Sequence, residues 1–283
     1  MSPLRIFLLA SLTMLAFAGN SLLCRLALKE ARIDAVSFTS IRILSGALVL
    51  WLLLRLRDDR QPPTGNWFSA LALFVYAAGF SFAYVSLPAA TGALLLFGAV
   101  QATMIGYGLW RGERFGVQQG AGLLLALGGL IGLLLPGLSA PPLSGALLMM
   151  AAGIAWGVYS LRGQGGSEPT RATAGNFLRA VPFALLLSMV SYPLARFDVA
   201  GIFYALVSGA LTSGLGYALW YAVVPHLKAT SAATVQLSVP VLAALGAVLW
   251  LGETVSARLL VASCAVLGGI ALVILGRSPS AAP

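Results

Sequence analysis

The chain of 283 residues is 59% hydrophobic and only 9% charged, and its mean hydropathy is +0.94. A soluble domain usually devotes about a quarter of its residues to charge, so this composition could not cover a water-exposed surface. The formal net charge of +9 comes from basic residues scattered over several short loops. That pattern describes membrane topology and excludes a nucleic-acid-binding patch. The sequence therefore predicts an all-α integral membrane protein.

Ten stretches qualify as transmembrane helices, because a helix needs about 20 apolar residues to cross the hydrocarbon. Charge and proline mark the breaks between them, which are a polar loop at residues 55–60, Pro88, a proline-rich break at 135–144 and a glycine-rich loop at 163–170. The predicted crossings are residues 6–24, residues 35–54, two within 61–110, two within 115–161, and four that start near residues 173, 199, 230 and 259.

An internal repeat divides the chain into two halves. The matching segments, in order, are Gly19 with Gly157, Arg42 with Arg179, Ala90-Thr91 with Ala229-Thr230, Trp110-Arg111-Gly112-Glu113 with Trp250-Leu251-Gly252-Glu253, and Gly128-Gly129 with Gly268-Gly269. Their offsets drift only from 137 to 140 positions. Five crossings per half is an odd number, so the second half enters the membrane from the opposite face. The sequence predicts two inverted-topology five-helix repeats, residues 1–136 and 137–283, of the kind that enclose a central site in secondary transporters.

Basic residues set the predicted orientation, because cytoplasmic loops carry an excess of Lys and Arg. With the N-terminus inside, ten basic residues face the cytoplasm and five, including Arg25 and Lys29 in the first external loop, face outside. Both termini are therefore predicted to be cytoplasmic. The eight acidic residues all fall in predicted loops or at helix ends. Glu113 and Glu253 open crossings five and ten, where we expect them to cap the helix N-termini.

The chain resembles the ten-helix drug/metabolite transporter superfamily with paired EamA domains. The resemblance rests on Ala-Gly-Asn at 18–20, on Arg42, on Tyr84 followed by Ala89-Ala90-Thr91, and on the Gly-Glu and then Gly-Gly pattern that closes each half. It covers essentially the whole chain and is greatest to the YddG-type amino-acid exporters of bacterial inner membranes. The first half lacks a proline in crossing four where crossing nine has Pro240. The resemblance implies a multi-pass inner-membrane exporter that works by alternating access.

Polar, small and aromatic residues at helical spacing are candidates for the transport path, which we expect between crossings three, four, eight and nine. Gln101 on crossing four and Gln236 and Pro240 on crossing nine share faces with Gly and Ala, and Pro240 is expected to free a backbone acceptor near the midplane. The other uncharged substrate-binding candidates are Asn20, Tyr76, Phe80, Tyr84, Trp156, Tyr159, Ser213, Tyr217 and Trp220. For each aromatic residue, the alternative is an interface anchor. The GxxxG pairs 116/120, 128/132 and 153/157 are expected to pack helices.

Arg42 and Arg179 complete the candidate site, because a charge inside a membrane helix costs roughly 3 kcal/mol and usually faces a cavity or a partner. As repeat counterparts they are expected toward opposite mouths of the path. They would either meet a substrate carboxylate, brace a gate, or snorkel to the nearer interface. No carboxylate is predicted at mid-membrane, and this absence disfavours proton coupling. It also disfavours the small four-helix multidrug antiporters of the same superfamily, because those proteins use an embedded glutamate.

These features favour a carrier with an uncharged, aromatic-lined cavity, and the resemblance implies that it exports small zwitterions, above all amino acids with hydrophobic or aromatic side chains. Other small metabolites or drugs remain the alternative, and a channel is not excluded. An intramembrane enzyme is disfavoured, because His226 is the only histidine and no metal-binding or catalytic cluster accompanies it or Ser213. No phosphate loop for ATP is present, and no cofactor or metal is expected. The expected partners are the substrate and the lipid bilayer; the oligomeric state is left open.

Overall fold

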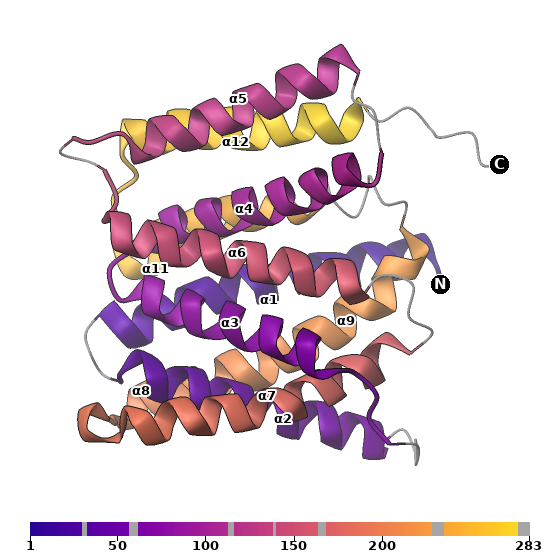
Figure 1. The fold of residues 1–283 in the computed structure, drawn as a ribbon, viewed down its shortest axis with the longest axis vertical. Helices are drawn as coiled ribbons and strands as arrows, with labels where there is room; N and C mark the ends of the chain where they lie inside the picture. The colour runs from indigo at the N-terminus through magenta and orange to yellow at the C-terminus, as the bar shows by residue number, and fades with distance from the viewer. Residues whose placement is uncertain are drawn as a thin grey trace.

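The computed structural model describes residues 1–29, 33–56, 62–112, 116–137, 140–163, 168–227 and 235–276, and every regular element in these ranges is helical (Figure 1). The α-helices are α1 (Pro3–Lys29), α2 (Ala35–Leu56), α3 (Trp67–Tyr84), α4 (Ala89–Trp110), α5 (Val117–Leu134), α6 (Leu143–Gly163), α7 (Pro169–Val190), α8 (Val199–Val207), α9 (Gly216–Val223), α11 (Ser238–Leu251) and α12 (Ala257–Leu275). A π-helical segment, Ser208–Leu215, joins α8 to α9, and short 3-10 turns follow α7 and α9 at Tyr192–Leu194 and Val224–His226.

Nine helices within the described residues are long and apolar enough to cross a membrane, and Ser238–Leu251 is a shorter apolar helix. One of the nine is the continuous stretch Val199–His226, which contains α8, the π-helical segment and α9. The predicted fold class is confirmed: this is an all-α integral membrane protein with the helices of a two-repeat, ten-crossing fold. The predicted start of crossing nine near Thr230, and the Ala229-Thr230 match, lie outside the described residues.

Helix ends follow local chemistry. Asn66 caps α3 by accepting the Ser69 N–H at 2.9 Å, and Ser256 caps α12 by accepting the Leu259 N–H at 3.2 Å. Gly252 ends α11 in the left-handed region, with φ at 60°, a conformation that glycine adopts without cost. Pro240 lies in the first turn of α11, where the N–H groups of a helix make no intrahelical hydrogen bond, so a proline is tolerated at this position.

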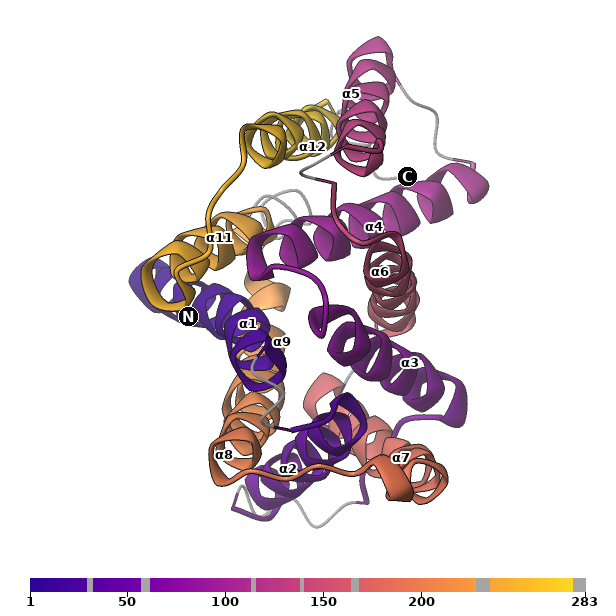
Figure 2. The ribbon, with the colours of Figure 1, turned by 90° about the vertical axis from the view of Figure 1, so that its left-hand side faces the viewer.

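The two halves exchange packing partners. Helix α1 packs against α8, α9 and α11, while α6 packs against α3 and α4, their counterparts from the first half. Three helices of the first half pack directly against their own counterparts in the second half: α2 against α7, α4 against α11, and α5 against α12. Figure 2 shows the α5/α12 pair side by side at one end of the molecule and α2 with α7 and α8 at the other. Because helices of one half pack against helices of the other, the middle of the bundle is bordered by both halves.

Glycines set the closest helix approaches, and the GxxxG expectation is correct for only one pair. A Cβ at Gly153 would lie 2.6 Å from the Leu96 carbonyl oxygen, and one at Gly157 would lie 2.8 Å from Thr103 Cβ, so α6 packs tightly on α4. On α5, positions 120, 128 and 132 face open space. Gly122 and Gly129 make the close contacts with α12 instead. The expectation was wrong for the pairs 116/120 and 128/132, because a Cβ at any of these positions would meet no atom of another helix within 4 Å.

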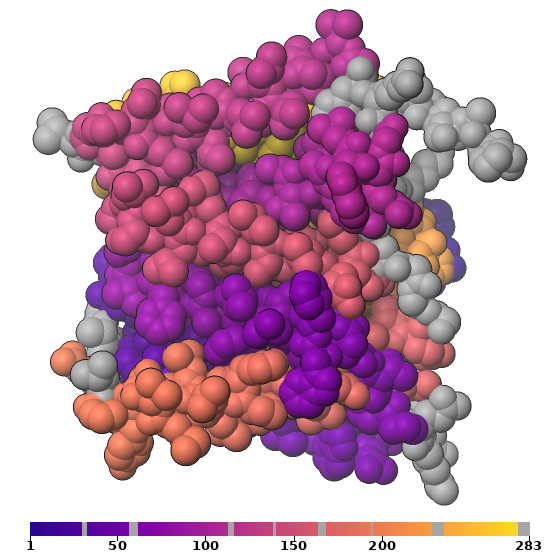
Figure 3. Space-filling view, in the orientation of Figure 1, coloured from indigo at the N-terminus to yellow at the C-terminus, as the bar shows by residue number. Residues whose placement is uncertain are grey.

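The outer surface of the bundle suits lipid. Large apolar side chains project from it, and Leu4, Trp110, Val117 and Leu249 are each more than two-thirds exposed. On the face shown in Figure 3, α6, α3 and α7 lie against one another, and parts of α12 are visible behind α5. An apolar exterior of this extent is stable in a hydrocarbon solvent and would aggregate in water.

Candidate functional site

A central cavity of about 20 Å³ lies between helices of both halves. Its walls come from α1 (Phe17, Asn20, Ser21), α3 (Tyr76, Phe80), α4 (Leu96, Phe97), α6 (Trp156), the π-helical segment (Thr212) and α9 (Tyr217). A volume of that size holds about one water molecule, whereas pockets that enclose drug-sized ligands occupy roughly 300–1,000 Å³. Occupation by an organic substrate therefore requires these helices to separate.

Aromatic rings in tilted and edge-on contact form the aromatic wall of the cavity. The Trp156 ring lies between the rings of Tyr76 and Tyr217, at centroid distances of 4.8 and 4.9 Å. Phe17 meets Tyr217 edge-on at 5.8 Å, and Phe80 lies 5.6 Å from Tyr76. Rings from α1, α3, α6 and α9 thus make one continuous apolar surface, which could hold an apolar side chain or the face-on approach of a cation.

Asn20 organises the polar side of the cavity. Its carbonyl oxygen Oδ1 accepts from the Ser208 hydroxyl at 2.7 Å and lies 3.1 Å from the Thr212 hydroxyl, which shares its one proton with the Ser208 carbonyl at 2.7 Å. Its amide nitrogen Nδ2 donates to the Tyr76 hydroxyl at 3.4 Å. Because both donors approach the carbonyl oxygen, the amide group is oriented with its NH₂ toward Tyr76.

Arg42 lies directly behind this polar side. Its side chain is only 2% exposed, and its guanidinium donates from Nη2 to the Tyr76 hydroxyl at 2.9 Å and from Nε to the Ser213 hydroxyl at 3.1 Å. The guanidinium carbon also lies over the rings of Tyr76 and Phe80, at 5.1 and 4.9 Å from their centroids. The third nitrogen, Nη1, is buried and has no hydrogen-bond partner. The result is a buried cation held by neutral groups only.

The π-helical segment positions the hydroxyls around Arg42 and Asn20. Wider π turns displace side chains relative to an α-helix and recur at functional sites. Here Ser208 and Thr212 face Asn20, while Ser213 faces Arg42. Gly209 permits the approach of α2, because a Cβ at that position would overlap the Arg42 carbonyl oxygen and the Ser45 hydroxyl.

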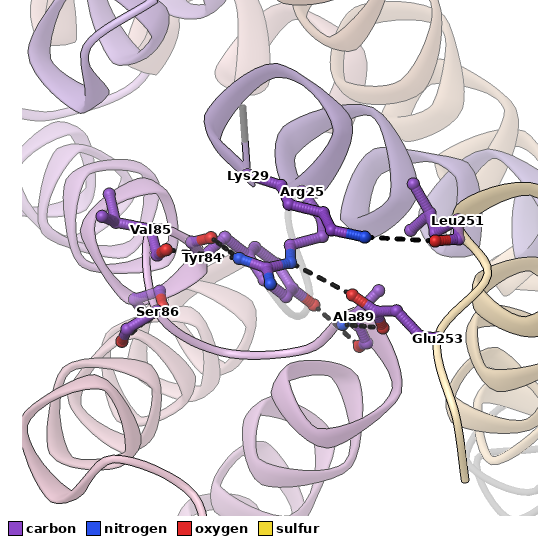
Figure 4. A network of polar contacts seen from close by, with 9 residues as sticks. Arg25, Lys29, Tyr84, Val85, Ser86, Ala89, Leu251 and Glu253 are labelled. Atoms are coloured by element: carbon purple, nitrogen blue, oxygen red, sulfur yellow. Dashed lines mark hydrogen bonds and ion pairs between the residues drawn. The ribbon is translucent and has the colours of Figure 1, made fainter. Parts of the chain in front are cut away.

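A network of charged groups closes one end of the bundle, which we call the Arg25 end (Figure 4). Arg25 Nε pairs with Glu253 Oε1 at 3.1 Å, and the two side chains are only 13% and 9% exposed. Arg25 Nη1 donates to the carbonyls of Tyr84 and Val85 at the end of α3, while Glu253 Oε2 accepts the Ala89 N–H, at the start of α4, at 2.7 Å. One ion pair therefore joins α1, α3, α4 and the segment after α11.

These contacts correct two expectations about the Arg25 end. Glu253 caps α4 and not crossing ten, because α12 begins only at Ala257 and is capped by Ser256. Arg25 and Lys29 belong to α1 and not to a loop, and Lys29 donates to the Leu251 carbonyl at 3.2 Å. Glu113, the other expected cap, lies outside the described residues.

Asp34 makes a second contact at the Arg25 end. Its two carboxylate oxygens accept the Ser37 N–H at 2.9 Å and the Arg196 N–H at 2.8 Å, which ties the start of α2 to the segment before α8. Partial burial by itself would raise the pKa of Asp34. The hydrogen bonds from the Arg196 and Ser37 backbones stabilise the carboxylate more strongly, so its pKa lies below the ordinary value of 3.8.

The opposite end, which we call the Arg162 end, is joined by different groups. Arg162 on α6 donates to Ser69 Oγ at 3.2 Å and to Asn66 Oδ1 at 3.3 Å, both at the start of α3. Asn176 on α7 accepts the Asn66 N–H at 3.0 Å. Arg179, which is half-buried, donates to the Thr64 carbonyl at 2.8 Å. Hydrogen bonds between these residues, and not an ion pair between them, hold α3, α6 and α7 together at the Arg162 end.

The structure brings together half of the predicted site. Asn20, Tyr76, Phe80, Trp156 and Tyr217 line the cavity, Arg42 lies one hydrogen bond behind Tyr76, and Ser213 lies behind Arg42. The other predicted residues are not among the lining residues; they are Tyr84, Gln101, Tyr159, Arg179, Trp220, Gln236 and Pro240. Among the described residues, crossing nine contributes none of the walls of this cavity, whereas α1 and α6 contribute four residues.

Several residues at the site were missed from the sequence. Phe17, Ser21, Leu96, Phe97 and Thr212 line the cavity, and Ser208 supports Asn20. Phe17 and Ser21 flank the recognised Asn20 at helical spacing, which is a signal that could have found them. Ser208 and Thr212 depend on the π-helical segment, which hydrophobic periodicity does not reveal.

Fold and site together define a multi-pass α-helical membrane protein built around a buried cavity that is aromatic on one side and polar on the other. Residues 4–135 and 143–275 each match the EamA-like transporter family. The chain belongs to the EamA-like transporter family, whose members are transporters and not enzymes.

Similar proteins include three relatives and one solved structure. An uncharacterized protein of Pseudomonas aeruginosa is 61% identical over 98% of this chain and 97% of its own length. An uncharacterized transporter of Archaeoglobus fulgidus is 26% identical over 87% of this chain and 89% of its own. The threonine/homoserine exporter RhtA of Salmonella typhimurium is 30% identical over 44% of this chain and 43% of its own. A solved structure of 21% identity aligns with a TM-score of 0.69 over 97% of this chain and 98% of that one, which shows a shared fold.

Proposed function

We propose that this protein is a secondary transporter that exports small zwitterions, above all amino acids with hydrophobic or aromatic side chains. The observation that carries the proposal is the composition of the cavity, in which a continuous aromatic wall faces a polar side backed by the buried cation Arg42. An aromatic wall suits an apolar side chain, and a cation without an acidic partner suits a carboxylate. The partial similarity to a threonine/homoserine exporter supports amino acids as the substrates.

Alternating access is the mechanism that we infer. Each half contributes helices to the cavity, and the cavity is too small for an amino acid, so binding and release require the halves to move against each other. With both termini in the cytoplasm of a bacterial inner membrane, the Arg25 end faces outward and its ion pair closes the outer mouth. The halves in this proposal are residues 1–136 and 137–283. Transport needs no ATP or cofactor.

Counterflow into liposomes tests the proposal. Purified protein would be reconstituted with an excess of one unlabelled amino acid inside, and uptake of the labelled form would be followed for phenylalanine, tryptophan, leucine, threonine and homoserine. Saturable uptake of at least one of them is expected. If none of them exchanges while an unrelated metabolite or drug does, the substrate class is wrong. Conductance far above carrier turnover would indicate a channel instead.

A further inference from the structure

The Tyr76 hydroxyl has both lone pairs occupied, so it can only donate to a further partner, and in the present arrangement the Tyr217 side chain is such a partner within its reach. A phenolic hydroxyl carries one donor hydrogen and two acceptor lone pairs. At Tyr76 the oxygen accepts from Arg42 Nη2 at 2.9 Å and from Asn20 Nδ2 at 3.4 Å. Its ring lines the cavity. A hydroxyl that accepts from a guanidinium is polarised by it and becomes a better donor.

Asn20 presents a second donor on the same side of the cavity. Its carbonyl oxygen is taken by the Ser208 and Thr212 hydroxyls, so only the NH₂ group is left for new contacts. One of the two N–H bonds goes to Tyr76, and Asn20 lines the cavity. The second N–H is therefore the natural partner of an acceptor that enters there.

The charge of Arg42 is not neutralised by any of its hydrogen bonds. Its acceptors are the hydroxyls of Tyr76 and Ser213, and Nη1 has no acceptor. All four carboxylates among the described residues lie near helix ends, at Asp34, Glu168, Asp198 and Glu253. A guanidinium buried in a low dielectric without a counter-charge makes its surroundings favourable for an anion. The polar side of the cavity therefore combines two hydrogen-bond donors with an uncompensated positive charge one hydrogen bond behind them.

We propose that Tyr76 and Asn20 bind the carboxylate of the substrate and that Arg42 acts on this carboxylate through Tyr76. The aromatic wall holds the rest of the molecule, and no acidic group among the cavity's lining residues pairs with an ammonium. The carboxylate is thus required for recognition and the amino group is dispensable, which extends the ligand class to simple aryl and alkyl carboxylates. This inference rests on the proposed function, because it concerns the same cavity.

Competition in the counterflow assay tests the inference with three probes that share one side chain. Against exchange of labelled phenylalanine, we expect 3-phenylpropionate, which lacks the amino group, to compete within a few-fold of phenylalanine. Phenylalaninamide, which lacks the carboxylate, is expected to compete about ten- to a hundredfold less well, the loss typical of a hydrogen bond to a charged group. If phenylalaninamide competes as well as phenylalanine, or phenylpropionate fails to compete, the carboxylate assignment is wrong while the transporter stands. If no amino acid exchanges, the proposed function is wrong and the inference falls with it.

Two variants separate recognition from folding. Tyr76→Phe keeps the ring and removes only the hydroxyl, and Arg42→Gln removes the charge. Both are expected to reduce the preference for phenylpropionate over phenylalaninamide to a few-fold. This ratio is the readout because it cancels any loss of folded protein. Arg42→Lys should retain the preference. Tyr204→Phe, on α8 and away from the cavity, is the matched hydroxyl control and should leave the ratio unchanged. An unchanged ratio in Tyr76→Phe and Arg42→Gln would overturn the inference.

Discussion

Arg25 and Glu253 lie 228 positions apart in the sequence and form an ion pair with 3.1 Å between Nε and Oε1. Both side chains are mostly buried, so the pair is weakly screened by water. The second oxygen of Glu253 accepts the first N–H of α4, where the helix dipole adds to the attraction. The pair therefore couples the first half of the chain to the end of α11, and separation of the halves at this end must break it.

Glu253→Gln is expected to open the Arg25 end. The amide can still accept from Ala89 but cannot pair with the charge of Arg25. Cys24 is a native reporter, because it is fully buried and adjacent to Arg25, while the other cysteine, Cys264, is exposed. In purified protein carrying Cys264→Ser, maleimide labelling of Cys24 should accelerate about ten- to a hundredfold, which corresponds to the loss of a charge-assisted contact.

Glu168→Gln is the matched control for the labelling experiment. Glu168 is exposed and precedes α7 at the Arg162 end, and at 3.9 Å from Arg171 it is too far for a charge-assisted hydrogen bond, so this pair contributes little. Cys24 in the Glu168→Gln protein should be labelled at the same rate as Cys24 in the parent protein. A Glu253→Gln protein that labels no faster than this control would contradict the role of the ion pair as a closing contact.

Asp34 gives the protein a pH-dependent contact at the Arg25 end. Because its folded pKa lies below the ordinary 3.8, the carboxylate stabilises the fold at pH values above 3.8, and this contribution is lost as the pH falls through the lower, folded value. Asp34→Asn should therefore have a lower melting temperature than the parent at pH 7, and the difference should shrink as the pH falls below 3.8. A difference that does not shrink in this range would show that Asp34 does not act through its charge.

Gly209→Ala should disturb the site by forcing α2 away from the π-helical segment. The added methyl would overlap the Arg42 carbonyl oxygen and the Ser45 hydroxyl. Overpacking of this kind costs about 1–3 kcal/mol, and it displaces the backbone that carries Arg42. We expect a lower melting temperature in detergent and reduced transport. Gly128→Ala, which would add a methyl in open space on α5, is the control and should be neutral or slightly stabilising. Equal stability of the two variants would contradict the close approach.

The helices of this protein were predictable from the sequence because the bilayer fixes their length. Pro88 and the prolines at 135–144 marked breaks that the structure places between α3 and α4 and between α5 and α6. The site was predictable only in part. Asn20 and Arg42 stand out because polar and charged groups are costly in lipid. Thr212 and Ser208 were missed because a π-helical segment rotates them, and Arg42 was expected to have Arg179 as an equivalent, although only Arg42 reaches the centre.

The two ends of α3 suggest a last prediction. Arg25 and Arg162 are 137 positions apart, the offset that also relates Arg42 to Arg179, and they bind opposite ends of α3, Arg25 at Tyr84 and Arg162 at Asn66. If the halves move as proposed, these contacts stabilise closure at opposite ends, and weakening one shifts the population toward opening at that end. Arg25→Ala should therefore accelerate labelling of Cys24, while Arg162→Ala should slow it or leave it unchanged. Acceleration by both variants to the same extent would indicate general loosening of the bundle and would contradict alternating access.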